Sequence, residues 1–344
     1  MRAKQHGFRQ PAEWVRHAAV WTAWPHLADE WADGLDEPRA SLAQMITAIV
    51  DRGPTGPRGE RVELLCLDAA TEADARARLG AAAAGVRFHR AYYGDVWLRD
   101  TGPIFVTRGA ERAAACFHWN GWGGKYFMPG DASVSVWVAG AAGVPAWDQG
   151  FVLEGGAVEV DGEGTVMTTT QCLLGGSRNP GVDQAAATKL LEESLGADHV
   201  IWLDRGLAND HTDGHIDTLA RFVAPGVVTA MAPAKDDPNH AALEGILADL
   251  RAAKDARGRA LEVVTVPSPG TVRDAAGTLM PASYMNFYIG NTTVVVPTYR
   301  AEADDAAVAA IAALFPDRRT VGVDCYPILV GGGGFHCTTQ QEPA

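Results

Sequence analysis

The stretch "TVGVDCYPILVGGGGFHC" occupies residues 320–337 and contains the features that decide both the fold and the chemistry. Its first eleven residues, 320–330, are mostly β-branched or apolar and predict a buried strand. Four glycines follow this expected strand directly, where they allow a positive φ or a close backbone approach without a Cβ clash. The cysteine beyond this turn, Cys337, is either a packed apolar residue or a thiol presented for chemistry.

Strands of the same kind recur along the chain and alternate with alanine-rich helices. We expect strands within 61–68, 86–93, 102–108, 114–120, 156–160, 165–174, 199–204, 219–231, 261–267 and 287–299. We expect helices at 39–51, 72–84, 183–195, 240–254 and 303–314. This alternation predicts an α/β fold. No break in composition divides the chain, so a single domain over residues 1–344 is expected.

The composition is that of a globular protein, with 47% hydrophobic and 21% charged residues. There is no run of 18 apolar residues, so no transmembrane helix is expected, and the polar N-terminus lacks the apolar core of a signal peptide. The five cysteines are odd in number and include no C-x-x-C pair. This usage disfavours a disulfide framework or a zinc ribbon and favours a reducing cytoplasm.

The formal net charge of −13 excludes one class of partner. No cluster of lysines and arginines is present to bind a phosphate backbone, so nucleic-acid binding is not expected. An acidic protein attracts small cations through its general field. The charge alone identifies no particular cation.

Polar residues stand beside glycines at five positions, separated by roughly 50 to 70 residues. Five similar strand–helix units, each sending one polar turn toward a common axis, would produce this spacing, although chance could produce it too. The five stretches are "WLRDTGP" (97–103), "EGG" (154–156), "DGHID" (213–217), "PASYMNF" (281–287) and "GGGGFHC" (331–337).

His215 and Asp217 are separated by one residue, so on a strand both side chains face the same side. Such a pair can place a substrate group between an acid/base and a carboxylate, but an isolated H-x-D is more often a solvated turn. A metal site is a third interpretation, because His211, Asp213, His215 and Asp217 alternate and Cys337 could join them. This pattern matches catalytic zinc motifs poorly, and no metal is expected.

Two further carboxylates lie beside glycine turns. Asp100 follows Arg99 and precedes a Gly-Pro turn, with Trp97 three residues earlier, and Glu154 ends an apolar stretch before two glycines. The simplest alternatives are that Arg99 and Asp100 form a surface ion pair, that Trp97 is a core residue, and that Glu154 is exposed to solvent. One thiol, one imidazole and three carboxylates together suit nucleophilic attack on a guanidinium carbon, because carboxylates pair with its N–H fork.

The sequence resembles the agmatine deiminase family, grouped with the bacterial peptidyl-arginine deiminases in the guanidine-modifying pentein superfamily. The resemblance extends over nearly the whole chain. It rests on "TAWPH" (22–26), "WLRDTGP" (97–103), "NGWGGKY" (120–126), "EGGAVEVDGEGTVMTTTQCLL" (154–174), "SRNP" (177–180), "DGHIDTLARF" (213–222), "PASYMNFYIGN" (281–291) and "GGGGFHCTTQQEP" (331–343).

The resemblance implies a five-bladed α/β propeller of pseudo-fivefold symmetry, the pentein fold, formed by one catalytic domain. It also implies hydrolysis of agmatine to N-carbamoylputrescine and ammonia in putrescine biosynthesis, with no cofactor. Matched motif by motif, Cys337 resembles the nucleophile and His215 the general acid/base. Asp100 and Asp217 resemble the carboxylates that grip the guanidinium, and Glu154 the glutamate that supports the histidine.

Trp97, His211 and Gly334 are expected to line the substrate channel. His211 departs from the family pattern, which has an acidic or small polar residue there that could help to hold agmatine's distal ammonium. A deiminase of another small or peptide-linked guanidine, an amidinotransferase and a metal-dependent hydrolase therefore remain alternatives, as does a silent guanidine-binding protein. A homo-oligomer is compatible with the sequence, which does not fix the number of chains.

Overall fold

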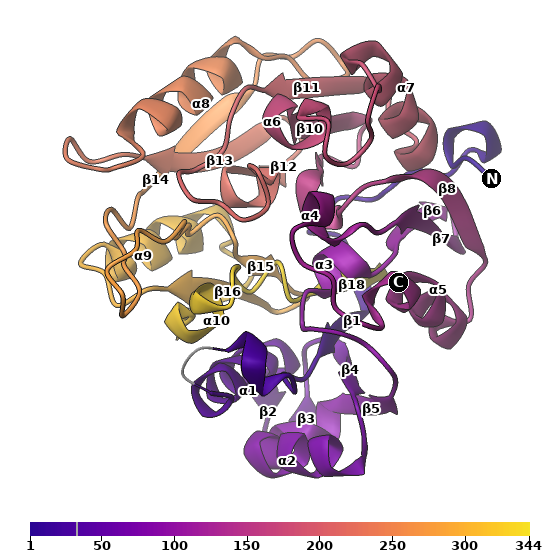
Figure 1. Cartoon of the computed structure of the whole chain (residues 1–344), viewed down its shortest axis with the longest axis vertical. Helices are drawn as coiled ribbons and strands as arrows, with labels where there is room; N and C mark the ends of the chain where they lie inside the picture. The colour runs from indigo at the N-terminus through magenta and orange to yellow at the C-terminus, as the bar shows by residue number, and fades with distance from the viewer. Residues whose placement is uncertain (32–33) are drawn as a thin grey trace.

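The structure is a computed structural model that describes residues 1–31 and 34–344 (Figure 1). Within these residues the strands form five sheets of three or four strands and one two-stranded ribbon. The sheets comprise β18 (Gln340–Pro343), β1 (His17–Ala23), β4 (Arg61–Cys66) and β5 (Val86–Arg90); β6 (Ile104–Arg108), β7 (Glu111–His118) and β8 (Ala146–Val152); β9 (Glu159–Val160), β10 (Thr165–Thr169) and β11 (His199–Leu203); β12 (Ala220–Ala224), β13 (Val227–Ala232) and β14 (Glu262–Pro267); and β15 (Tyr288–Ile289), β16 (Thr293–Thr298) and β17 (Arg319–Asp324).

All five sheets share one strand pattern. In each sheet one inner strand pairs antiparallel with one neighbour and parallel with the other, as β7 does with β6 and β8, and in the four-stranded sheet β4 also pairs parallel with β5. A parallel pair needs a crossover, and here a helix supplies it each time. These helices are α1 (Asp36–Val50), α2 (Ala69–Leu79), α5 (Asp131–Ala142), α7 (Gln184–Leu195), α8 (His240–Ala252) and α9 (Asp304–Leu314). The predicted α/β class is therefore confirmed.

Local sequence explains where several of these helices begin and end. Asp183 is the N-cap of α7, where its carboxylate accepts a hydrogen bond from the amide of Ala186, and Gly196 ends the helix at a φ of 71°. Asp68 caps α2 (Ala69–Leu79) in the same way by accepting from the amide of Thr71. Such caps satisfy backbone groups that a helix end leaves without partners.

Residues 320–330 do not form the single strand that was expected. β17 ends at Asp324, and Tyr326–Val330 forms the short helix α10. Pro327 stands in the first turn of α10, where it costs no hydrogen bond, and the carboxylate of Asp324 accepts from the amide of Tyr326. The glycine run thus follows a helix that turns the chain back, and not a strand end.

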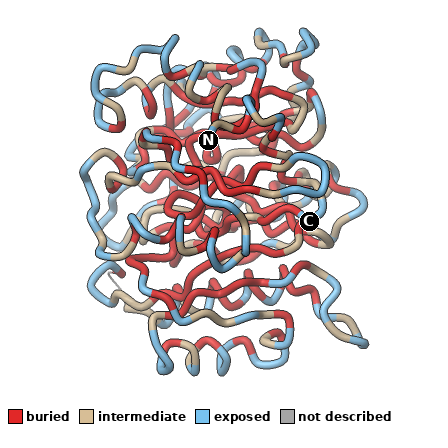
Figure 2. Tube along the Cα trace, turned by 90° about the vertical axis from the view of Figure 1, so that its right-hand side faces the viewer, coloured by how far each residue is buried: buried red, intermediate tan, exposed pale blue. Residues whose placement is uncertain are grey.

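Burial follows this architecture (Figure 2). Buried residues fill the middle of the molecule, and exposed residues lie mainly in the outer helices and loops.

Helix α5 and the strands β1, β8 and β18 were not predicted. The described residues include no helix with the length and hydrophobicity required to cross a membrane. The remaining elements are β2 (Arg52–Gly53), β3 (Gly56–Pro57), α3 (Leu98–Thr101), α4 (Gly121–Gly124), α6 (Thr170–Leu174), η1 (Lys4–His6), η2 (Ala28–Glu30), η3 (Gly80–Gly85), η4 (Gly155–Ala157) and η5 (Ile216–Thr218).

Candidate active site

Four separate turns bring together the five side chains predicted to carry the chemistry. Cys337 lies between α10 and β18, Asp100 in α3, and Glu154 immediately before η4. His215 and Asp217 were considered above as residues of a strand. In the structure they lie instead at η5, a turn of 3₁₀-helix before β12. All five residues are buried, with at most 6% of their surface exposed. None of them is a solvated surface group.

Gly156 marks the point where three of these groups converge. A Cβ placed on Gly156 would lie 2.6 Å from Nδ1 of His215, 2.9 Å from Oδ1 of Asp100 and 3.0 Å from Oδ2 of Asp217. Any side chain at Gly156 would therefore fill the space between the imidazole and the two carboxylates. The amide of Gly156 also donates a 2.9 Å hydrogen bond to Oδ1 of Asp100, which fixes that carboxylate.

The thiol of Cys337 lies beside the same group. Its Sγ is 3.6 Å from Oδ2 of Asp217, and Nδ2 of Asn286 donates to Sγ over 3.2 Å. Oδ1 of Asn286 accepts from the amide of Cys337 at 3.1 Å, so one side chain fixes both ends of the cysteine. Burial and the charges of Asp217 and Asp100 raise the pKa of this thiol well above its ordinary value. The free site therefore holds a thiol, not a thiolate.

The glycines before Cys337 permit close packing, as expected. A Cβ on Gly334 would lie 2.5 Å from Oδ1 of Asn286, and one on Gly333 would lie 2.7 Å from Cζ3 of Trp97. Real Cβ atoms do not approach other atoms this closely, so a side chain at either position would displace the group that holds or faces the thiol. Gly332 alone in the run has a φ in the left-handed region, 118°.

Asp217 is held by a buried chain of charged groups. Its Oδ2 lies 2.8 Å from Nδ1 of His336, whose Nε2 lies 2.8 Å from Oε2 of Glu13. Arg221 donates to the same Glu13 oxygen at 2.7 Å. Burial alone would raise the pKa of Asp217, but the hydrogen bond and charge of His336 outweigh it and hold that pKa below its ordinary value. Asp217 is thus a permanent carboxylate beside the thiol.

Asp100 and His215 form a second charged pair. Nδ1 of His215 lies 3.8 Å from Oδ1 of Asp100, whose other oxygen accepts from Nε1 of Trp122 at 2.9 Å. Burial raises the pKa of Asp100 to about 6. Burial opposes protonation of His215, but Asp100 and other neighbours raise its pKa to about 10. Near neutral pH, His215 therefore carries a proton that it can donate.

Glu154 lies behind the imidazole. Its Oε1 accepts from Nε of Arg178 at 3.0 Å, and Arg178 donates further to the carbonyl of Thr212 at 2.7 Å and to Asp213. Asp213 also pairs with Nζ of Lys125 at 2.7 Å. Asp213 lies in a turn with a φ of 65°, and its side chain is engaged in these two ion pairs.

The alternating residues considered as a metal site do not come together. His211 is exposed at the pocket rim, and Asp213 is occupied by Arg178 and Lys125. Over residues 1–31 and 34–344, the one group of three metal-ligating side chains whose donor atoms cluster is Glu154, Cys172 and His215.

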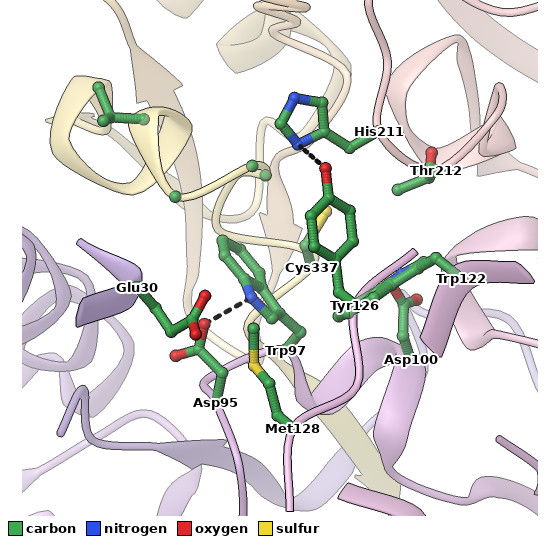
Figure 3. A pocket seen from close by; sticks show the side chains of 14 residues that line it. Glu30, Asp95, Trp97, Asp100, Trp122, Tyr126, Met128, His211, Thr212 and Cys337 are labelled. Atoms are coloured by element: carbon green, nitrogen blue, oxygen red, sulfur yellow. Dashed lines mark hydrogen bonds between the residues drawn. The ribbon is translucent and has the colours of Figure 1, made fainter. Parts of the chain in front are cut away.

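A pocket of about 180 Å³ opens onto the thiol (Figure 3). Cys337 and Asp100 lie at its inner end, and Trp97 forms a wall. Nε1 of Trp97 donates to Oδ2 of Asp95 at 2.9 Å, and Glu30 lies on the same side of the pocket as Asp95. The other lining residues are Trp122, Tyr126, Met128, His211, Thr212, Val330, Gly331, Gly332 and Gly333. A pocket lined by aromatic rings and by the carboxylates of Glu30, Asp95 and Asp100 suits a slender cationic molecule.

His211 stands at the rim of this pocket. Its ring stacks on Tyr126 with centroids 5.8 Å apart, and the Tyr126 hydroxyl lies 3.4 Å from Nδ1 of His211 (Figure 3). Trp97 and His211 therefore line the pocket as expected. Gly334 does not line it but packs against Asn286.

The sequence did not single out several buried residues of the site, most of which lie in stretches quoted above. Asn286 is in "PASYMNF", His336 precedes the cysteine in "GGGGFHC", and Arg178 is in "SRNP". A polar residue inside an apolar stretch was the available signal, because buried polar groups need partners. The signal marks a residue but does not name its partner. The other missed residues are Glu13, Asp95, Trp122 and Cys172.

Comparison with known proteins identifies the family of the chain. The family model for Porphyromonas-type peptidyl-arginine deiminase matches residues 9–343. The agmatine deiminase of Ectopseudomonas mendocina (strain ymp) is 36% identical over 363 residues, covering 98% of this chain and 96% of that one. The agmatine deiminase of Pseudomonas fluorescens (strain SBW25) is 35% identical, with 98% and 96% covered.

A solved structure gives the same result. The structure described as agmatine deiminase of Enterococcus faecalis catalyzing its reaction superposes with a TM-score of 0.91 at 32% identity, covering 99% of this chain and 97% of that one. Family, relatives and solved structure all match the chain from end to end. The chain therefore belongs to the Porphyromonas-type peptidyl-arginine deiminase family, and within it to the agmatine deiminases.

Proposed function

We propose that this protein hydrolyses the guanidinium group of agmatine to give N-carbamoylputrescine and ammonia, through a covalent intermediate on Cys337. One observation carries the proposal: His215, Asp100 and Asp217 converge beside Gly156, and Cys337, whose Sγ lies 3.6 Å from Asp217, lines with Asp100 a pocket that also contains other carboxylates. Two carboxylates match the planar N–H fork of a guanidinium, and they place its carbon beside the sulfur.

In the first step the substrate's own charge activates the nucleophile. A guanidinium between Asp100 and Asp217 offsets the two negative charges that raise the thiol pKa, so Cys337 can lose its proton to solvent water. Sulfur then forms a bond to the guanidinium carbon. His215 donates its proton to the departing nitrogen, the C–N bond breaks, and ammonia leaves behind an S-alkyl thiouronium on Cys337.

In the second step water replaces the sulfur. His215, now neutral, takes a proton from the attacking water while oxygen bonds to the same carbon. The C–S bond breaks, the thiol of Cys337 is restored, and the ureido product leaves. Glu154 and Arg178 hold the turn that carries His215 in place, since Arg178 binds both Glu154 and the carbonyl of Thr212.

The pocket favours agmatine over arginine. Agmatine ends in an ammonium that Glu30 would attract and that would favour ionisation of Asp95, whose pKa burial raises to about 7, whereas arginine adds a carboxylate that both would repel. Asp95 and Glu30 thus supply the negative charge that an acidic residue at position 211 would have supplied, where this chain has His211. Incubation with agmatine, arginine and a peptide ending in arginine, assayed for ureido product, tests the assignment. Product from agmatine is expected in clear excess, and a preference for the peptide would overturn it.

Replacing Glu30 with glutamine should raise KM for agmatine several-fold and change kcat little. Glu30 is exposed, so its attraction for the distal ammonium is worth at most about 1 kcal/mol. The matched control is Asp29→Asn, an exposed carboxylate in the same turn that does not line the pocket. Steady-state kinetics with agmatine provide the measurement, and equal KM values for the two variants would contradict this role of Glu30.

Cys337 should be the thiol that a haloacetamidine alkylates fastest, because this small cation can enter the carboxylate clamp. Burial raises the pKa of the other four thiols too, and among the cysteines Cys337 alone lines the described pocket. The cationic haloacetamidine should alkylate Cys337 at least about tenfold faster than neutral haloacetamide, since a hydrogen bond to a charged group contributes roughly 1.5–3 kcal/mol. Peptide mapping gives the site, and label mainly on Cys116 would contradict the assignment.

The metal-dependent alternative is separated by chelation. Because a thiol and an imidazole suffice for the chemistry above, the purified protein should keep its activity in EDTA. Loss of activity that added zinc restores would instead support metal-assisted hydrolysis. An amidinotransferase would be recognised by transfer of the amidino group to an added amine.

We also propose that the five sheets are blades of an α/β propeller, formed by one catalytic domain over residues 1–344. The strand order shared by the sheets supports this arrangement, as does the supply of site residues by several of them. A reducing cytoplasm is supported by five cysteines that all remain free thiols. Nucleic-acid binding is not expected, and light scattering would determine whether the chain forms a homo-oligomer.

A further inference from the structure

Three buried ligand groups lie together behind the proposed active site. The donor atoms of Glu154, Cys172 and His215 all lie within 4.8 Å of one another, and all three residues are fully buried. They come from three turns, at η4, in α6 and at η5. The mechanism above uses Glu154 and His215 but gives no part to Cys172, whose thiol stands next to the imidazole.

Two of these residues have binding capacity to spare. Within the described part of the chain, Oε2 of Glu154 and both ring nitrogens of His215 have no hydrogen-bond partner. Buried polar atoms without partners are rare in folded proteins, and each is costly unless something else binds there. Arg178 occupies only Oε1 of Glu154, so Oε2 remains available as a single-oxygen ligand.

Thiolate, imidazole and carboxylate are the three ligand types that Zn²⁺ accepts. Ligand–metal distances of about 2.0–2.3 Å in a tetrahedral site put donor atoms about 3.4–3.6 Å apart. A separation of up to 4.8 Å therefore needs small side-chain shifts and no rebuilding of the turns. Zn²⁺ would replace the protons of His215 and Cys172. The negative charges of Asp100, Glu154 and the Cys172 thiolate, which Arg178 offsets only in part, would then favour the divalent cation.

We propose that Glu154, Cys172 and His215 form an inhibitory binding site for Zn²⁺. A bound ion would take the lone pair that His215 needs to accept a proton from water, so turnover would stop. The ion would arrive through the pocket past Asp100, which lines it and lies 3.8 Å from His215. Zinc binding itself is independent of the proposed reaction, whereas inhibition rests on the role of His215 in it.

Cobalt(II), a spectroscopic substitute for zinc, tests the binding directly. The test uses the Cys337→Ala protein, which removes the competing thiol, and adds Cys172→Ala, Cys172→Ser or, as control, Cys116→Ala. One equivalent of Co²⁺ should produce a thiolate-to-cobalt charge-transfer band in Cys337→Ala and in the Cys116 control. Neither Cys172 variant should show it, while circular dichroism confirms their folding. No band in Cys337→Ala, or a band that survives loss of Cys172, would overturn the site.

Zinc inhibition is measured separately in proteins that keep Cys337. Wild type and Cys116→Ala should lose activity at low buffered Zn²⁺ and regain it in EDTA. Cys172→Ser, compared with its own rate without metal, should require at least about tenfold more zinc for the same fractional loss. Equal sensitivity of Cys172→Ser would mean that zinc acts at Cys337 instead. A cobalt band in Cys337→Ala together with no deiminase activity in the wild-type protein would retain the metal site and refute only the proposed function.

Discussion

Replacing Cys337 with alanine is expected to lower kcat/KM for agmatine by at least about 10⁴-fold, since no other group can form the covalent intermediate. Binding of agmatine should be retained in this variant, because Asp100 and Asp217 keep their positions beside Gly156. Ureido product formation measures the rate, and a thermal shift on adding agmatine measures binding. The control is Cys116→Ala, a buried cysteine on β7 outside the pocket, which should retain normal activity.

A Cys337→Ala protein that keeps a tenth of normal activity would contradict the account. Hydrolysis would then proceed by direct attack of water on the bound guanidinium. The thiol would be a packing residue, the other interpretation that the sequence allowed for a cysteine after a glycine turn.

The second large effect concerns charge. Asp100→Asn and Asp217→Asn should each lower kcat/KM by about 10²-fold or more with the fold retained. Each change replaces a charge-assisted contact with the guanidinium by a neutral one, and hydrogen bonds to charged groups contribute roughly 1.5–3 kcal/mol. Leaving a buried cation with only one carboxylate adds to the loss. Steady-state kinetics with agmatine give the values.

Asp213→Asn is the matched control, in the same loop as Asp217. Its carboxylate contacts Arg178 and Lys125 rather than the space beside Gly156, and an asparagine oxygen can still accept from either cation. A much smaller loss is therefore expected. If Asp213→Asn were as damaging as Asp217→Asn while Asp100→Asn remained active, the two-carboxylate clamp would be wrongly placed.

Much of the fold was predictable from local pattern. β-branched and apolar runs located β4, β10, β13 and β16, and alanine-rich segments located α7, α8 and α9. Helix α5 was missed because "DASVSVWVAGAA" contains three valines and a glycine, which local propensity does not favour in a helix. Val134, Val138 and Ala139 are buried there, so packing against the sheet stabilises this helix.

Non-local pairing explains the remaining errors in the fold. β18 is a polar segment near the C-terminus, and it forms only because β1, more than 300 residues earlier in numbering, offers a free edge. Residues 326–330 read as strand because they are apolar, yet Pro327 and the cap from Asp324 favour a short helix. Sequence periodicity does not show that β1 has a free edge. It also does not show whether the apolar run or the helix signals at Pro327 and Asp324 will decide the local structure.

The site was predictable as residue types but not as geometry. The resemblance identified Cys337, His215 and Asp217, and the structure brings them to one point. What fixes them is long-range: Asn286 lies 51 residues from Cys337, and Glu13 lies 323 residues from His336. No spacing rule connects such partners, because they meet only after separate sheets have packed.

Trapping the intermediate tests the central claim most directly. Wild-type protein is mixed with agmatine, quenched in acid during turnover and digested for mass spectrometry. The account predicts that the peptide containing Cys337 gains the mass of agmatine less ammonia. Rapid turnover with Cys337 unmodified at every quench time, or an adduct on another cysteine such as Cys172, would contradict it.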